Sequence, residues 1–294
     1  MTRPSTRRFT VDENVALTVD VWRTEVGDTD PAAAFLMVHG LASNAQMWWG
    51  VAEELSRSGH ACAAVDQRGH GRSDKPDDGY TLDRACLDLL ALIEQLDLGA
   101  GPLVVAGQSW GANVALELGW RHPDRLAGVV CVDGGTIELS ERFPDWESCA
   151  SALAPPRLTG TPHSEIEAML RGSHPDWPGS GIDASLANFE TRPDGTVAPR
   201  LSFEHHMQLL RALWEHRPST RYAGMKIPVL FVPADDGRKS AWVEDKRQSI
   251  EAAVRALLRA KSRWFAPADH DIHAQFPREL AQVLHGEVTS GILS

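Results

Sequence analysis

The sequence predicts a mixed α/β protein with a mostly parallel sheet and helices on both of its faces. Short apolar segments alternate along the chain with longer segments of helical periodicity. This alternation stops near Gly134 and resumes after Lys226. A Gly-x-Ser-x-Gly pattern also stands between one predicted strand and the helix that follows it. Because parallel strands need long crossover connections, which helices usually provide, the alternation favours a sheet between two helical layers.

The first part of the chain, residues 1–133, accounts for most of the predicted sheet. Period-two alternation over 7–11 and 15–22, with Asp-Glu-Asn between them, predicts a hairpin. Continuous apolar runs are typical of strands buried on both faces. These runs are 34–38, 61–65, 103–106 and 126–132. Helical patterns separate them, at 47–57, 81–96 and 110–121.

The second part, residues 134–226, contains no predicted strand and is dense in proline, tryptophan and histidine. Helices are predicted there at 165–171 and 203–215. Long inserts in compact domains are usually functional, so we expect a helical lid. The last part, residues 227–294, again alternates, with strands at 228–232 and 263–265 and helices at 242–258 and 278–284. The three parts are expected to form one domain.

The charge and the cysteine content narrow the classes of function. The chain has 29 Lys and Arg against 40 Asp and Glu, so its formal net charge is 29 − 40 = −11. Such a chain is repelled by phosphate backbones, which argues against a nucleic-acid partner. The four cysteines lack metal-binding spacing and are predicted to be buried free thiols in a reducing compartment: Cys62, Cys86, Cys131 and Cys149.

No apolar stretch approaches the ~18 residues of a membrane span, and no signal peptide is recognisable. We therefore expect a cytoplasmic protein. No metal site and no dinucleotide fingerprint is recognisable either, so no cofactor is expected. The sequence does not decide between a monomer and a homodimer.

The strongest chemical signal is Gly107-Gln108-Ser109-Trp110-Gly111, which follows a predicted strand and opens a predicted helix. In this context the pattern is typical of a nucleophile elbow. The glycines permit a tight turn, and Ser109 can then present its hydroxyl in a strained conformation. The dipole of the following helix favours negative charge at the same place.

Together with three further motifs, this segment resembles the α/β-hydrolase family. His39-Gly40 followed by Trp48 is similar to the family's HG…W segment. Residues 66–73, Asp-Gln-Arg-Gly-His-Gly-Arg-Ser, are similar to its D-x-R-G-x-G-x-S loop, and 121–125 to its R-H-P-x-R segment. The resemblance implies an eight-stranded, mostly parallel sheet with a lid inserted after strand six. Ala112 departs from the family pattern, since many members have a second glycine there.

The resemblance also implies positions for the residues that act with Ser109. Two backbone N–H groups are expected to stabilise the oxyanion, those of Leu41 and Trp110. The general base is expected after the last strand, where the spacing to Gln275 and Pro277 favours His270 over His273.

The third member of the triad, the carboxylate that orients the histidine, is the least determined. The family commonly carries it after strand seven, which favours Asp236, although the family position itself falls one residue later, on Gly237. Other members carry it after strand six, where Asp133 stands. We rank Asp236 slightly ahead of Asp133, with Asp235 behind both.

We therefore expect a serine hydrolase that cleaves a small to medium hydrophobic ester or lactone through an acyl-enzyme at Ser109. Trp110, Trp177 and Trp214 are the candidate substrate-binding residues of a partly aromatic pocket. The alternatives within the class are amides, thioesters and C–C bonds beside a carbonyl. An alternative outside it is a non-catalytic receptor for a small ligand on the same scaffold.

Overall fold

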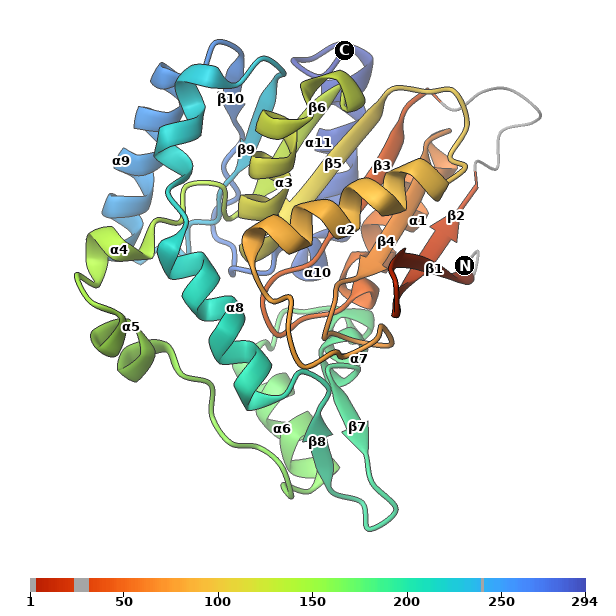
Figure 1. Ribbon diagram of the computed structural model, residues 1–294, viewed down its shortest axis with the longest axis vertical. Coiled ribbons are helices and arrows are strands. Elements are labelled where there is room, and N and C mark those ends of the chain that lie inside the picture. Colours follow the sequence, from red (N-terminus) through yellow and green to blue (C-terminus); the bar gives the residue numbers. More distant parts are fainter. Residues whose placement is uncertain (1–3, 24–31, 239–240) are drawn as a thin grey trace.

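The computed structural model describes residues 4–23, 32–238 and 241–294 and shows an eight-stranded sheet (Figure 1). Its strand order is β1-β2-β4-β3-β5-β6-β9-β10. β1 and β2 pair antiparallel, as do β2 and β4, and every other pair in this sheet is parallel. The strands are β1 Ser5–Asp12, β2 Val15–Trp22, β3 Ala34–Val38, β4 Ala61–Asp66, β5 Leu103–Gln108, β6 Gly128–Val132, β9 Val229–Val232 and β10 Ala260–Ser262. The predicted fold class is confirmed.

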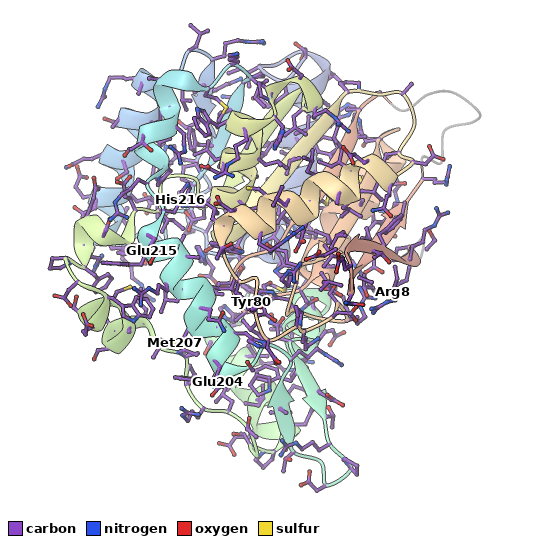
Figure 2. The ribbon with its side chains drawn as sticks, in the orientation of Figure 1. Arg8, Tyr80, Glu204, Met207, Glu215 and His216 are labelled. Atoms are coloured by element: carbon purple, nitrogen blue, oxygen red, sulfur yellow. The ribbon has the colours of Figure 1, made fainter. Side chains whose placement is uncertain are left out.

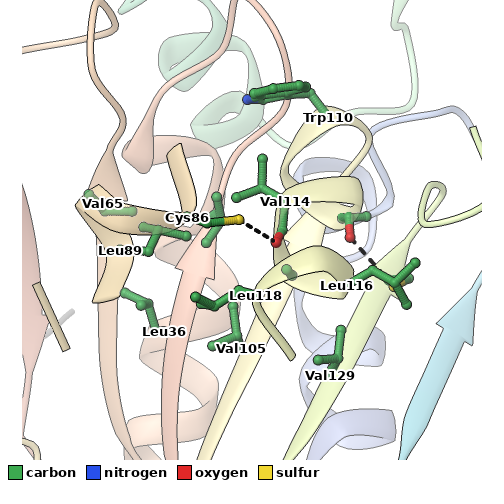
Figure 3. Packing of buried hydrophobic residues seen from close by; sticks show 14 of the residues in the cluster. Leu36, Val65, Cys86, Leu89, Val105, Trp110, Val114, Leu116, Leu118 and Val129 are labelled. Atoms are coloured by element: carbon green, nitrogen blue, oxygen red, sulfur yellow. Dashed lines mark hydrogen bonds between the residues drawn. The ribbon is translucent and has the colours of Figure 1, made fainter. Parts of the chain in front are cut away.

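Helices cover both faces of this sheet (Figure 1). One face carries α2 Leu82–Gln95, α3 Trp110–Arg121 and α9 Ala241–Ala256. The other carries α1 Trp49–Arg57 and α11 Pro277–Thr289. Figure 3 shows how α2 and α3 pack on the first face, where Cys86 and Leu89 lie close to Val114. All four cysteines are buried and free.

Residues 134–226, called the insert below, lie between β6 and β9. Its helices are α4 Leu139–Arg142, α5 Trp146–Leu153, α6 His163–Ser173, α7 Gly179–Leu186 and α8 Phe203–Glu215. The prediction of an insert without strands is wrong, because β7 Phe189–Thr191 and β8 Val197–Pro199 form a small antiparallel hairpin. Each strand has three residues, mostly solvent-accessible, which is too short for a period-two pattern. The Pro-Asp-Gly turn at 193–195 is the signal that could have predicted the hairpin.

The last strand is also shifted from its predicted position of 263–265 to Ala260–Ser262. Its residues are Ala-Lys-Ser on the sheet edge and are only half-buried, so no apolar run marks them. Backbone pairing nevertheless continues beyond it, since the Arg263 N–H donates to the Phe231 carbonyl at 2.8 Å. The aromatic residues at 264–265 thus lie where the chain leaves this edge.

Helix α8 anchors the insert on the core at two places. Near its start, His205 stacks on Tyr80, and the two ring centroids are 4.2 Å apart. Figure 2 labels Tyr80 and Glu204, the residue that precedes His205 in α8. After its end, His216 and Arg221 reach the buried Glu117 carboxylate at 3.3 and 2.8 Å. Burial raises the pKa of Glu117, but its hydrogen bonds outweigh that effect and lower the pKa to about 2.

Short elements complete the described chain: η1 Ala45–Trp48, η2 Pro123–Arg125, η3 Pro218–Gly224 and α10 Ile272–Gln275. No helix in the described ranges combines the length and the apolar character that crossing a bilayer requires.

Candidate active site

Ser109 occupies a strained turn between β5 and α3. Its backbone has φ 53° and ψ −118°, a conformation that non-glycine residues rarely adopt. The flanking glycines are required by packing. A Cβ on Gly107 would lie 2.0 Å from the Gly111 carbonyl oxygen, and one on Gly111 would lie 2.3 Å from the Val38 carbonyl oxygen. Close contact between β3, β5 and α3 therefore produces the bend that carries the half-buried serine.

Asp133 follows β6 directly beside this turn. The Ser109 N–H donates to the carbonyl of Val132 at 2.9 Å, so the serine and the aspartate leave neighbouring strands together. Asp133 also has a positive φ, 42°. Its carboxylate is buried and accepts from the Ala234 N–H at 2.9 Å and from Lys246 Nζ at 2.7 and 3.0 Å.

His270 completes the group from the loop after β10. Its Nδ1 lies 2.6 Å from Asp133 Oδ2. An ionised carboxylate only accepts, so Nδ1 carries the proton and Nε2 is the nitrogen left to accept one. The side chain of Gln108, the residue before the serine, donates to the His270 carbonyl at 3.3 Å. The structure therefore gathers the loops of Ser109, Asp133 and His270 at the carboxyl edge of the sheet.

The two titratable groups shift each other's pKa. Desolvation lowers the pKa of His270, but the hydrogen bond to Asp133 and its negative charge outweigh this and leave the pKa raised. Burial raises the pKa of Asp133, but His270 and Lys246 outweigh it and leave that pKa lowered. The pair thus favours a charged carboxylate that stabilises an imidazolium.

Asp236, which we ranked first among the candidate acids, does not contact the imidazole, whereas Asp133 does. Its side chain is exposed, accepts from the Arg238 N–H at 2.9 Å and lies 4.0 Å from the Arg238 guanidinium. Asp235 accepts from Arg247 at 3.0 Å instead. Family spacing favoured the loop after β9, but the described part of that loop gives Asp133 one backbone donor, the Ala234 N–H, and no acid to His270.

The other histidine candidate, His273, is part of the core. It is fully buried, its ring lies 4.6 Å from that of Trp48, and neither ring nitrogen has a hydrogen-bond partner among the described residues. Burial lowers its pKa to about 3. It is therefore held neutral by its apolar surroundings.

The loop after β3, which carries Leu41, is held by the segment after β4. Asp66 accepts from the Ala45 N–H at 2.7 Å. The Gln67 amide donates to the His39 carbonyl at 2.7 Å and accepts from the Trp110 indole at 3.1 Å. Gln67 therefore links the two chain segments in which the oxyanion donors were expected, a role that its sequence position did not reveal.

The three tryptophans proposed as substrate-binding residues have other partners. Trp110 is completely buried against the core cluster of Figure 3. The Trp177 indole donates to Asp269 at 2.9 Å, and that of Trp214 to the Phe143 carbonyl at 2.8 Å. None of the three lines either of the two larger cavities found among the described residues. Their aromatic surface mainly packs the insert and the core together.

These two cavities border different loops. One of about 430 Å³ borders Asp133, Lys246 and His270. The other, of about 420 Å³, borders Ala42 and Ser43 and reaches into the insert. Across the described ranges, no group of three His, Cys, Asp or Glu side chains could hold a metal ion.

Comparison with known proteins agrees with this architecture. Residues 33–159 match the family described as alpha/beta hydrolase fold. The chain is similar to 2-(acetamidomethylene)succinate hydrolase of Mesorhizobium japonicum, with 28% identity over 233 residues, which cover 77% of this chain and 80% of the relative. It is also similar to epoxide hydrolase B of Mycobacterium tuberculosis, with 35% identity over 97 residues, which cover 32% of this chain and 27% of that one.

Solved structures agree along nearly the whole chain. The crystal structure of E-2-(acetamidomethylene)succinate hydrolase has 25% identity and a TM-score of 0.72, and the match covers 96% of this chain and 97% of that one. The enol-lactonase from Burkholderia xenovorans LB400 has 17% identity and a TM-score of 0.69, covering 97% and 100%. The chain has the α/β-hydrolase fold and is a hydrolase.

Proposed function

We propose that the protein is a serine hydrolase in which Ser109 is the nucleophile, His270 the general base and Asp133 the orienting carboxylate. The observation that carries this proposal is the 2.6 Å contact between His270 Nδ1 and Asp133 Oδ2. It fixes the imidazole tautomer that leaves Nε2 free to accept the serine proton. Asp133 replaces Asp236 as the preferred acid because it is the carboxylate that meets the ring.

The reaction then has two halves. Ser109 Oγ forms a bond to the substrate carbonyl carbon as its proton passes to His270 Nε2. When the tetrahedral intermediate collapses, the bond to the leaving group breaks, and His270 returns the proton to that group. Water attacks the acyl-enzyme through the same base, which releases the acid and restores Ser109.

Two backbone N–H groups are proposed to stabilise the oxyanion. Trp110 is the first residue of α3, so its N–H has no partner within the helix. The second donor is the N–H of Leu41, in the loop that Asp66 and Gln67 hold. Backbone donors stabilise an oxyanion best when the fold already holds them in position before the charge develops. The hydrogen bonds that anchor the Leu41 loop therefore support the assignment of its N–H.

The bond cleaved is proposed to be a small ester or lactone, with the insert acting as the lid over it. An amide is the second candidate, because the relative named 2-(acetamidomethylene)succinate hydrolase is similar over 77% of this chain and its substrate name contains an acetamido group. The cytoplasmic location and the homodimer stay predictions.

The test is hydrolysis of short 4-nitrophenyl esters by the wild type and by Ser109→Ala. We expect the substitution to lower kcat by roughly 10³-fold or more, because the nucleophile is lost while the fold is kept. Trapping the acyl-enzyme and measuring its mass would locate the acyl group on Ser109. Equal turnover by the two proteins would overturn the proposal, and ligand binding without any turnover would favour the receptor alternative.

A further inference from the structure

The second cavity lies beside the loop that follows β3. It is bordered by Ala42 and Ser43 of the loop that carries Leu41. The same loop touches the elbow, since a Cβ on Gly40 would lie 3.2 Å from the Ser109 Cβ. A volume of about 420 Å³ suits a small organic molecule. A substrate with its carbonyl at Ser109 can therefore extend into this space.

Two arginines of the insert line the cavity without a carboxylate partner. No carboxylate of a described residue lies within 4.0 Å of the guanidinium of Arg157 or of Arg200, whereas Arg171 of the same insert pairs with Glu167 at 2.8 Å. The Arg157 guanidinium lies over the ring of Phe203, 4.0 Å from its centroid. Arg200 uses its Nε on the Ala187 carbonyl at 3.2 Å, which leaves its terminal nitrogens available.

A third cation strengthens the positive charge at this place. Lys75 donates to the carbonyl of Gly71, which borders the cavity, at 2.9 Å. Burial and the positive charge of Arg200 together lower the pKa of Lys75, although nearby carboxylates act against them. Arg157 and Arg200 thus line one cavity, and Lys75 bonds to its wall at Gly71, where Asp66, Asp74 and Glu190 offset part of the lysine's charge.

The cavity also offers neutral hydrogen-bonding groups. Ser43 borders the cavity, and its Oγ is buried without a hydrogen-bond partner among the described residues. Asn188 borders the same space, and its Oδ1 accepts from Asn44 Nδ2 at 2.6 Å. A buried hydroxyl without a partner is costly unless a ligand satisfies it. Guanidinium groups that line one cavity and have no carboxylate partner among the described residues are the groups that bind a carboxylate best.

We propose that the substrate carries a carboxylate apart from the bond that is cleaved, and that Arg157 and Arg200 bind this carboxylate. The proposal rests on the proposed function, since it names the substrate class of that same site. It replaces the expected hydrophobic substrate with an anionic one. The apolar part of the lining, which includes Pro155 and Leu201, suits the short carbon chain between the two groups.

The kinetic test compares two matched pairs of esters. The 4-nitrophenyl monoesters of adipic and pimelic acid carry a free carboxylate, and their methyl-capped forms do not. We expect the wild type to show at least about tenfold higher kcat/KM for the free acids. Each guanidinium removed, in Arg157→Gln or Arg200→Gln, should lower that value by about tenfold and leave the methyl-capped esters unaffected.

Arg192→Gln is the matched control. Arg192 belongs to the same insert, is exposed, pairs with no described carboxylate and does not border the cavity. This variant should behave as the wild type toward both kinds of ester. Equal kcat/KM for free and capped esters in the wild type would overturn the proposal, as would an equal loss in the control.

A binding measurement separates failure of this proposal from failure of the proposed function. Adipate is titrated calorimetrically into Ser109→Ala, with and without Arg157→Gln and Arg200→Gln. Binding that weakens about tenfold or more in the arginine variants supports the anion site, even if no ester is hydrolysed. Binding that is absent, or unchanged by both substitutions, overturns it, even if Ser109 proves to be the nucleophile.

Discussion

The loops that follow β6 and β9 begin side by side, and each begins with acidic residues close to its strand. Val132 and Val232 are paired in the parallel sheet, with Asp133 and Asp235 soon after them. The Asp133 side chain is 3% exposed and contacts His270, whereas that of Asp236 is 42% exposed and, among the described residues, contacts Arg238 of its own loop. Neighbouring aspartates at one sheet edge therefore have different chemistry.

The difference shows what makes a carboxylate suitable for a triad. Both oxygens of Asp133 are fixed by donors from three elements: the Ala234 N–H, Lys246 and His270. The Ala234 N–H belongs to the loop after β9, which therefore supports the acid instead of supplying it. A buried carboxylate is tolerated only with such a complete set of partners.

The largest expected effect separates the two loops by activity. Asp133→Asn should lower kcat/KM by roughly 10³- to 10⁴-fold, because the amide no longer stabilises the imidazolium or fixes its tautomer. Asp236→Asn should stay within about twofold of the wild type, since surface changes away from a site have small effects. Ester hydrolysis at equal folded concentration measures both.

Circular dichroism would show that Asp133→Asn is folded, and Ser109→Ala sets the background rate. A large loss in Asp236→Asn together with a small loss in Asp133→Asn would reverse the comparison. It would mean that the loop after β9 rearranges to supply the acid.

A smaller effect is expected at Lys246, which binds Asp133 from α9. Its positive charge lowers the pKa of His270, so Lys246→Met should raise that pKa. The base acts only when it is unprotonated, so the acid limb of kcat/KM should move to higher pH. Activity should therefore fall more at about pH 6 than at about pH 9, which a pH–rate profile measures.

Arg247→Met is the matched control, because Arg247 lies next in α9 and pairs with Asp235 of the other loop. Its profile should coincide with that of the wild type. A uniform loss in Lys246→Met at every pH would mean that Lys246 only holds the fold and has no effect on the titration of the base.

The elbow turn could be predicted from the sequence because its geometry requires glycine at fixed positions, whereas the choice of His270 as the base came from the spacing of the family that the sequence resembles. Gly107 is needed because a Cβ there would meet the backbone of Gly111, and Gly111 because a Cβ there would meet the carbonyl of Val38; both requirements fall on the elbow itself and leave a visible motif. The acid depends on contacts between elements far apart in the chain. Lys246 and Asp133 are separated by 113 positions, and nothing near Lys246 marks it as a partner.

The insert was the least predictable region for a related reason. Its tryptophans satisfied the pattern for an aromatic pocket, but Trp177 and Trp214 bond to Asp269 and to the Phe143 carbonyl. Whether an aromatic ring faces a ligand or a neighbouring helix depends on tertiary packing, which composition does not contain. The sequence likewise does not show that Arg157 and Arg200 line one cavity with no described carboxylate within 4.0 Å, because that depends on tertiary structure.

The smallest effect concerns stability and tests the same contrast without catalysis. Asp235→Asn breaks a pair whose arginine is 42% exposed, so it should cost no more than about 1 kcal/mol of unfolding free energy. Asp133→Asn leaves Lys246 and His270 without their buried anion and should cost about 3 kcal/mol. Urea unfolding at about pH 7 measures both values.

The pKa of Asp133 is lowered in the folded protein, so its contribution to the unfolding free energy is present above the unfolded pKa and is lost as pH falls through the folded pKa. The unfolding free energies of the two variants should therefore converge in acid. Equal costs at neutral pH would show that burial does not distinguish the two loops, and the assignment of Asp133 would then depend on kinetics alone.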